Sequence, residues 1–543
     1  MKLNACEMNP VSSKPVWVIG GQEKNRLSVE TYQDKLMGCF LGKNVGGTAG
    51  APMEWIRQIN DFHFYLQELD GNPLPNDDLD IQLLWLVALE ERGLKLDAKT
   101  LGEYWLTFVT PHWSEYGIGK INMRSGLPAP LCGTHYNEYK DSCGAFIRSE
   151  IWAAIAPGAP QIAAKYAYED AILDHGDGEG TYAEIFAAAM QSAAFVESDM
   201  HKLVEIGLSY IPAECVTAQA VRFVVDAHEK GMDYLKLRDE VLERYRGCVS
   251  GANPVTGSDE DREKGLLDGK LGFDVPSNIA IVIIGMLYCD DDFEKLMCYT
   301  INCGEDTDCT AATAGAIFGI IHGQGKIPEK WLEPIGYSIK TGCLNLGELG
   351  GYGAEIPATI NELVERVVRI GRQVSLAYSS AAEIVDEKAE TYVGVDMNCA
   401  DASVFEEMAK GPIYSFDFFD IQLVYEGGPS LRNNEEKKIT LRIVNRYKNV
   451  EALDIKVWCE DDLAVLPGKS GRMLVKAPYF RGPAFRGNLE CAEFILTCEN
   501  ITTPAIGGVF QITSPGRHTN MCVPFTMINA NLQNYANDFY YKF

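Results

Sequence analysis

The chain has 543 residues, of which 46% are hydrophobic and 23% are charged, and its net charge is −28. This composition is typical of a soluble globular protein with roughly two to four domains. The 76 acidic residues outnumber the 48 basic ones, and no run of Lys or Arg forms the basic patch that nucleic-acid binders usually carry. We therefore expect no nucleic-acid partner, whereas the acidic charge suits divalent cations.

The first 20 residues lack a basic start followed by a continuous apolar core, so we expect no signal peptide. The longest apolar run, at residues 279–288, is too short to cross a bilayer. The 16 cysteines are scattered without CxxC pairs, which is typical of free buried thiols. These features predict a cytoplasmic protein without a membrane partner, and they do not indicate an oligomeric state.

Residues 1 to about 28 look irregular, apart from a strand candidate at 16–19. From Thr31 onward apolar residues recur at helical spacing, and small residues concentrate between Gly38 and Gly50. Pro52 ends this helix and leaves Glu54 on the turn that follows.

Helical periodicity continues to about residue 395. The long aromatic- and Gly-rich segment 111–139 is expected to be a functional loop, and 259–274 an exposed one. The expected helices after the first are 81–89, 100–109, 143–156, 161–173, 181–196, 202–211, 215–229, 234–245, 277–289, 293–299, 307–322 and 360–379.

From about Tyr414 a two-residue alternation replaces the helical period. Short β-prone segments follow at 439–444, 454–459, 473–476, 493–498 and 508–512, separated by turn residues such as Pro467-Gly468. The predicted fold is therefore multidomain: an all-α helical bundle over residues 28–395, followed by a small all-β sandwich over 412–543. Trp458 and Tyr479 are candidate sugar-contact residues of the sandwich, but such modules also serve as packing partners.

Two acidic clusters, 76–80 and 305–308, stand at the starts of strongly apolar helices. A single acidic first turn is more often a cap than a site, because the helix N-terminus stabilises carboxylates by itself. Each cluster, however, holds three carboxylates, which repel one another unless a cation binds. Oxygen ligands suit Mg²⁺ best, with Mn²⁺ or Ca²⁺ possible. We expect the two clusters to meet and to enclose one or two divalent ions.

Several spaced motifs accompany these clusters. They are Gly38-Cys39-Phe40-Leu41-Gly42, the stretch from Gly50 to Glu54, Cys303-Gly304-Glu305-Asp306-Thr307-Asp308, and Ile327-Pro328-Glu329-Lys330-Trp331. Over residues 31 to 335 the chain resembles the ADP-ribosylglycohydrolase superfamily, which includes the dinitrogenase-reductase-activating glycohydrolases. The resemblance implies an all-α bundle that carries two divalent metals and hydrolyses ADP-ribosyl bonds.

The resemblance also implies roles for single residues. Glu54 and Asp78 would be catalytic, with Glu54 facing the scissile bond. The implied metal ligands are Asn76, Asp77, Asp78, Asp306, Asp308 and Cys309, and the implied substrate contacts are Ser142, Cys143, Gly144 and His175.

This chain departs from the family pattern at several of these positions. Asn76 and Cys309 replace Thr, and a thiol is a poor ligand for hard cations. Glu305 replaces Gly and adds a carboxylate that could compensate. The remaining departures are Gly47 for Asp, and Ser142 and Cys143 for Gly and Asn.

Three functions stay open. The leading one is a metal-dependent glycohydrolase that acts on an ADP-ribosyl bond in a small-molecule or glycosylated substrate. The alternatives are a glycosidase for a carbohydrate or nucleoside, with Glu54 sharing the acid–base work, and a non-catalytic ligand binder.

Overall fold

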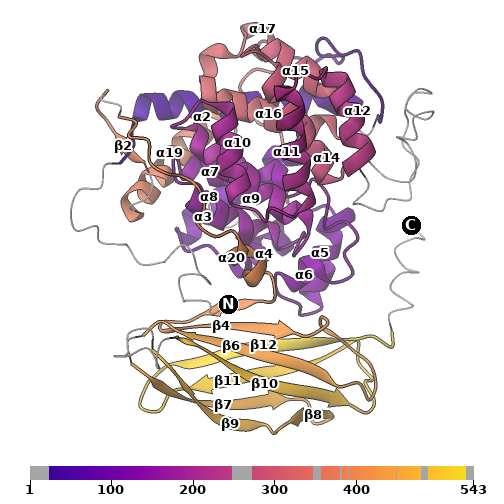
Figure 1. The fold of residues 1–543 in the computed structure, drawn as a ribbon, viewed down its shortest axis with the longest axis vertical. Coiled ribbons are helices and arrows are strands. Elements are labelled where there is room, and N and C mark those ends of the chain that lie inside the picture. The colour runs from indigo at the N-terminus through magenta and orange to yellow at the C-terminus, as the bar shows by residue number, and fades with distance from the viewer. Residues whose placement is uncertain are drawn as a thin grey trace. The chain divides into compact units, whose positions relative to one another are not determined.

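The computed structural model describes residues 24–54, 56–246, 272–345, 356–378, 382–388, 391–447, 449–477 and 487–532. Its chain divides into two compact units (Figure 1). The helical unit comprises Val11–Ile118 and Asn137–Ser403, and the sandwich unit comprises Met1–Pro10, Gly119–Tyr136 and Val404–Phe543. The strand expected at 16–19, Tyr479 and most of the loop expected at 259–274 lie outside the described residues.

The helical unit is built from α-helices and short 3₁₀ turns, with one pair of short parallel strands, β1 (Arg26–Ser28) and β2 (Glu383–Val385). Its helical elements are α2 (Val29–Gly50), η1 (Ala51–Met53), α3 (Asp77–Arg92), α4 (Ala98–Phe108), η2 (Phe146–Arg148), α7 (Glu150–Ile155), α8 (Pro160–Ala171), α9 (Glu179–Ala194), α10 (Met200–Ser209), α11 (Val216–Glu229), α12 (Tyr234–Tyr245), α14 (Val275–Tyr288), α15 (Phe293–Asn302), α16 (Thr307–His322), η3 (Gln324–Lys326), α17 (Glu329–Leu332) and α19 (Ile360–Ala377).

A line of glycines, which we call the glycine seam, brings α2 into backbone contact with α16. The seam consists of Gly38, Gly42, Gly46 and Gly50, spaced one helical turn apart on α2. A Cβ atom at any of them would lie only 2.1–2.4 Å from a carbonyl oxygen of α16. The contacts run antiparallel, from Gly38 on Gly319 to Gly50 on Thr307. The end of α2 therefore lies beside the start of α16, where the second acidic cluster stands.

Two parts of the sequence expectation are wrong. The segment 111–139 is not simply a loop, because it contains α5 (Ser114–Arg124) and α6 (Leu131–Thr134). Gly117 of α5 permits close packing against the chain that precedes the helix, since a Cβ there would lie 2.1 Å from the carbonyl oxygen of His112. The helix expected at 143–156 is reduced to η2 and α7, because Arg148 donates to the carbonyl oxygen of Gly144 and holds the preceding stretch in a turn.

The sandwich unit contains two five-stranded sheets, ordered β3-β4-β6-β10-β8 and β5-β12-β11-β7-β9. Neighbouring strands are antiparallel except for β5 and β12. The helix α20 (Ser403–Met408) leads into strands β3 (Ile413–Ser415), β4 (Phe419–Tyr425), β5 (Ser430–Leu431), β6 (Lys437–Asn445), β7 (Glu451–Cys459), β8 (Leu463–Leu466), β9 (Ser470–Val475), β10 (Leu489–Cys498), β11 (Ala505–Thr513) and β12 (Asn520–Asn529).

The core of the sandwich follows the expected alternation. On β6 the side chains of Ile439, Leu441 and Ile443 are buried, while Lys438, Thr440 and Arg442 are partly exposed. Leu127 and Leu131, from the segment inserted between the two parts of the helical unit, belong to the same hydrophobic cluster. The sandwich core is therefore completed by residues nearly 300 positions away in the sequence.

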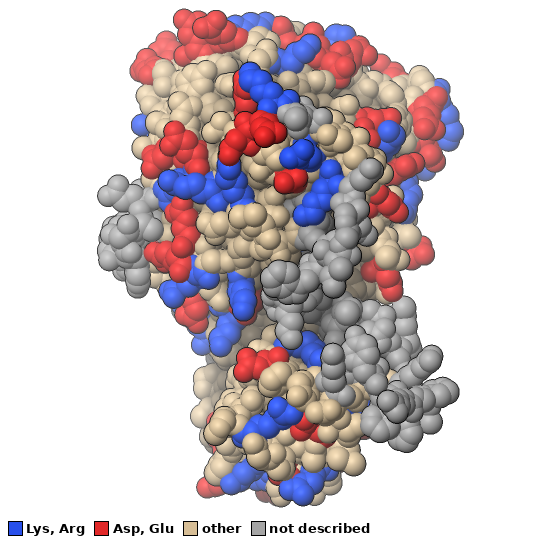
Figure 2. Space-filling view, turned by 90° about the vertical axis from the view of Figure 1, so that its left-hand side faces the viewer, with Lys and Arg blue, Asp and Glu red and all other residues tan. Residues whose placement is uncertain are grey.

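On the face in Figure 2, acidic and basic side chains are interspersed over the described surface. No helix within the described ranges combines the length and the apolar character needed to cross a bilayer. The cysteines of the described residues are all free, as expected.

Candidate metal and active site

The two acidic clusters meet at the starts of α3 and α16. The side-chain oxygen of Asn76 caps α3 by accepting from the backbone N–H of Asp78 at 2.8 Å. The amide nitrogen of the same side chain donates to Asp308 Oδ2 at 3.2 Å. One residue thus bridges two helix starts that are 232 positions apart. In this arrangement the Asn76 oxygen is used for capping.

Two overlapping groups of side chains could each hold a metal ion. The ligand atoms of Asp78, Asp308 and Cys309 lie within 4.8 Å of one another, and so do those of Glu54, Asp306 and Asp308. Asp308 belongs to both groups. Asp77 is in neither group, and its Oδ2 accepts a hydrogen bond from Tyr116 at 3.0 Å.

The chemistry of these donors fits a divalent cation. Asp78 Oδ2, Asp306 Oδ1 and Asp308 Oδ1 are buried and accept no hydrogen bond from any described residue. A buried carboxylate without a partner is costly, and a bound cation would remove that cost. Lys43 Nζ lies 3.1 Å from Asp78 Oδ1, but one ammonium cannot balance several carboxylates.

The pKa values of the site reflect the burial of several carboxylates close to one another. Burial, together with the charge of Asp78, raises the pKa of Asp77 to about 6, and burial with the charge of Asp308 raises that of Asp78 to about 6. Burial and the neighbouring aspartates raise the pKa of Glu54 to about 9. The pKa of Asp306 is also well above its usual range, because of burial and then Asp308. Protons therefore compete with any cation for these oxygens.

A buried polar network around Lys43 holds the Asp78 carboxylate in place. Lys43 of α2 also pairs with Glu150 of α7 at 3.1 Å, and Gln82 Nε2 donates to the same carboxylate at 2.8 Å. Burial alone would lower the pKa of Lys43, but Glu150 and Asp78 outweigh it and raise that pKa. Sequence reasoning missed this network. The available signal was a lone Lys within the small-residue stretch of α2, a position that burial permits only with carboxylate partners.

Glu305 does not supply the compensating ligand that its sequence position suggested. Its side chain is fully buried and forms ion pairs with Arg246 and with Arg57, the latter at 3.5 Å. Gly304 and Glu305 have φ values of 74° and 69°, so the backbone makes a left-handed turn just before the metal-facing aspartates. Asn278 fixes the backbone of Asp306, the residue after this turn, because Asn278 Oδ1 accepts from the Asp306 N–H at 3.2 Å.

The residues implied as substrate contacts lie together but are buried. Ser142 Oγ is 3.1 Å from His175 Nε2, and His175 Nδ1 is 2.8 Å from Asp174 Oδ1. Asp174 in turn pairs with Arg148 at 2.7 Å. This row has the order of a catalytic triad, yet Ser142 is only 1% exposed and His175 is 0% exposed. A nucleophile needs access to substrate, so the row acts as a scaffold for its loop.

Cys143 and Gly144 connect that scaffold to the metal-facing residues. Burial, and next the charge of Asp306, raise the pKa of the Cys143 thiol well above its usual range. A Cβ at Gly144 would lie 2.2 Å from Glu115 Oε1, so Glu115 packs directly on this turn. Burial raises the pKa of Glu115 to about 7, and its Oε2 accepts no hydrogen bond from a described residue. The sequence analysis did not single out Glu115.

Comparison with known proteins now decides the family. The profile of the ADP-ribosylglycohydrolase family matches residues 28–373, which is more than half of the chain. The chain belongs to the ADP-ribosylglycohydrolase family.

Two further similarities were found. An uncharacterized protein of Archaeoglobus fulgidus is 25% identical over 318 residues, covering 55% of this chain and 91% of that protein. The crystal structure of a FixG-related protein from Vibrio parahaemolyticus aligns with 21% of this chain and 99% of that chain, at 11% identity and a TM-score of 0.17.

The ADP-ribosylglycohydrolase family is generally metal-dependent, and this member has candidate acidic groups for a metal. Two of its departures from the family pattern are in contact with each other. A Cβ at Gly47 would lie 2.9 Å from Asn76 Nδ2, so the absence of a side chain at 47 makes room for the Asn76 amide.

Proposed function

We propose that this protein is a divalent-metal-dependent glycohydrolase that cleaves an ADP-ribosyl or related glycosidic bond. The observation that carries the proposal is the convergence of Asp78, Asp306 and Asp308, with buried oxygens that accept no hydrogen bond from any described residue. Family membership supports the reaction class. The metal ligands would be these three aspartates, with Glu54 and Cys309 completing the two groups.

The buried and the partly exposed side chains of the site would have different roles in the reaction. A bound divalent cation would supply Lewis-acid stabilisation for the charge that develops when the glycosidic bond breaks. Asp78 is held in place by Lys43, and Asp308 by Asn76. Glu54 is only partly buried and lies beside Asp306 and Asp308, so its carboxyl is the accessible acidic group of the site. It is therefore the residue suited to exchange a proton with substrate or water.

The test is turnover by protein stripped of metal and then reloaded. ADP-ribosyl-arginine, ADP-ribosyl-serine and a panel of aryl glycosides are assayed with Mg²⁺, Mn²⁺ or Ca²⁺. We expect metal-dependent release of the sugar from at least one substrate. Asp308→Asn is expected to lose at least about tenfold in metal affinity, whereas the control Asp61→Asn, at a side chain that is 96% exposed, keeps it. No turnover on any substrate by protein with measured bound metal would contradict the proposal.

A second candidate keeps the metal chemistry but changes the substrate to a carbohydrate or nucleoside. It is favoured by the burial of Ser142 and Cys143, which are 1% and 3% exposed and stand where the family has a Gly and an Asn. Calorimetric titration with ADP-ribose separates the two candidates. Binding supports the first, and its absence in protein that retains metal affinity supports the second.

A further inference from the structure

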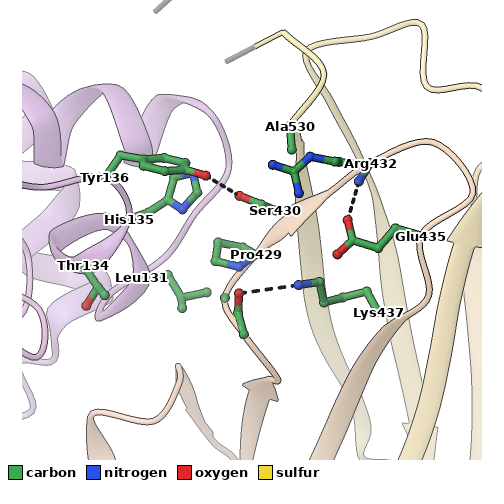
Figure 3. A pocket seen from close by; sticks show the side chains of 12 residues that line it. Leu131, Thr134, His135, Tyr136, Pro429, Ser430, Arg432, Glu435, Lys437 and Ala530 are labelled. Atoms are coloured by element: carbon green, nitrogen blue, oxygen red, sulfur yellow. Dashed lines mark hydrogen bonds between the residues drawn. The ribbon is translucent and has the colours of Figure 1, made fainter. Parts of the chain in front are cut away.

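A pocket of about 360 Å³ lies within the sandwich unit, between the end of α6 and the turn that leads into β5 (Figure 3). Its size falls within the range of small-ligand sites. Figure 3 shows His135 and Tyr136 on one side, and Arg432, Glu435 and Lys437 on the other. Nothing in the proposed hydrolytic site uses these residues.

One wall of the pocket is an exposed aromatic ring. Tyr136 is 63% exposed, and its φ of 47° is uncommon for a residue with a side chain. The imidazole of His135 packs edge-on against the ring at 4.2 Å, and the hydroxyl lies 3.3 Å from Ser430 Oγ. The ring is thus held in place with much of its surface open to solvent, as in sites that bind an amphipathic ring. Burial lowers the pKa of His135 to about 4, so this wall is neutral.

The opposite wall is positively charged. Among the described residues, neither Arg432 nor Lys437 pairs with a carboxylate through its side chain. Lys437 is only 8% exposed, yet its ammonium makes only long hydrogen bonds, at 3.3 and 3.5 Å, to the carbonyl oxygens of Glu426 and Gly427. Glu435 accepts from the backbone N–H of Arg432 at 2.8 Å. Two cations against one carboxylate are an unusual local balance in a chain of net charge −28.

We propose that this pocket binds an acidic sugar, a saccharide unit that carries a carboxylate or a phosphate. The acid group would face Arg432 and Lys437, since a guanidinium recognises carboxylate and phosphate by paired hydrogen bonds. The sugar ring would lie against Tyr136, and its hydroxyls would reach Ser430, His135 and Glu435. The sandwich unit is then a carbohydrate-binding module whose specificity is set by charge.

Trp458 offers an internal comparison. It is 53% exposed, but Lys456 Nζ lies 3.6 Å from the centre of its ring, and its indole N–H donates to Gln511. One face of its ring is therefore covered by Lys456, and Trp458 does not line the pocket. Trp458→Ala removes an exposed aromatic side chain from the same unit without touching the proposed site.

The experiment is calorimetric titration of the full-length protein with glucuronic acid, glucose 6-phosphate, glucose and inorganic phosphate. We expect at least one of the two acidic sugars to bind at least tenfold more tightly than both glucose and inorganic phosphate. Tyr136→Ala and Arg432→Gln should each weaken that binding at least tenfold, and Trp458→Ala should not. The two acidic sugars distinguish a carboxylate ligand from a phosphate ligand.

The proposal is overturned if neither acidic sugar binds, if glucose or inorganic phosphate binds as well as they do, or if both pocket variants keep full affinity. Thermal unfolding of each variant shows whether it is folded, which the exposure of Tyr136 and Arg432 favours. Hydrolysis by Arg432→Gln is measured in parallel and should equal that of the unmodified chain. Failure here would therefore leave the proposed glycohydrolase unaffected.

Discussion

Cys309 gives one of the two candidate ligand groups a sulfur atom, whereas the other group, around Glu54 and Asp306, offers only oxygen. Thiolates favour softer ions such as Zn²⁺ and Co²⁺ over Mg²⁺. Burial raises the pKa of the Cys309 thiol well above its usual range, so metal binding there must displace a proton. The two candidate metal positions are therefore chemically unequal, although both include Asp308.

Cys309→Thr should make the two positions more alike. We expect the variant to lose about tenfold or more of its affinity for Zn²⁺ while keeping its affinity for Mg²⁺. Binding of Co²⁺ to the unmodified chain should produce a near-ultraviolet thiolate charge-transfer band that the variant lacks. Cys298→Ser, at a partly exposed cysteine outside the cluster, is the control. Identical Co²⁺ spectra for the chain and Cys309→Thr would show that the sulfur is not a ligand.

Metal binding should also depend on pH in a defined direction. Burial raises the pKa values of Asp77 and Asp78 from the ordinary 3.8 of an aspartate to about 6. Without metal, the folded state therefore binds more protons than the unfolded state between pH 3.8 and about pH 6. Its free energy of unfolding falls as the pH rises through this range. A cation binds the deprotonated form, so its stabilising effect grows over the same window.

The measurement is the metal-induced rise in melting temperature across this pH range. We expect a large rise above about pH 7 and a small one below about pH 5. In Asp78→Asn the pH dependence should become shallower. A rise that is equally large at both ends of the range would contradict the assignment of Asp78 as a ligand.

At the scale of elements, the glycine seam sets where the candidate metal ligands lie. Because α2 and α16 touch through their backbones, the chain leaving α2 delivers Glu54 to the side of Asp306 and Asp308. A bulkier seam would separate the helices and move these ligands apart. The seam thus has a positional role in addition to its packing role.

Gly46→Ala tests that role. The added Cβ would lie 2.2 Å from the carbonyl oxygen of Ala311, so we expect a loss of about 1–3 kcal/mol in the free energy of unfolding. Metal affinity should fall as well, because the start of α16 shifts. Urea unfolding and metal titration measure the two effects. Gly325→Ala is the matched control, since nothing lies within 4 Å of its added Cβ. Unchanged metal affinity in folded Gly46→Ala would argue against the positional role.

The sequence predicted those elements whose signals are local. Apolar periodicity predicts α3 and α16, which begin at Asp77 and Thr307. Asn76 caps α3, whereas the Asp306 side chain makes no capping hydrogen bond at the start of α16. The direction of the Glu305 side chain was not predictable, because it depends on a positive φ that a non-glycine residue rarely adopts. The pairing of Lys43 with Glu150 spans 107 positions, and no local pattern encodes it.

At the scale of the whole molecule, the two units are interleaved in sequence. The sandwich unit takes Gly119–Tyr136 from the middle of the helical sequence, and Gly126 lies against Thr526 of β12. The sequence predicted a functional loop for this segment, because an apolar side chain does not reveal which distant core it joins. A chain ending at residue 403 would expose Leu127 and Leu131, which are 1% and 7% exposed here.

Leu127→Ala tests whether residues 119–136 stabilise the sandwich unit or the helical unit. Leu127 lies in the sandwich cluster, so we expect a loss of about 2–4 kcal/mol in the stability of the sandwich unit. Hydrogen exchange should therefore increase mainly in β11 and β12, although the substitution lies among the helices in sequence. Ile121→Ala, at a residue of α5 that is 38% exposed, should change exchange little. Faster exchange confined to the helical unit would show that residues 119–136 do not stabilise the sandwich.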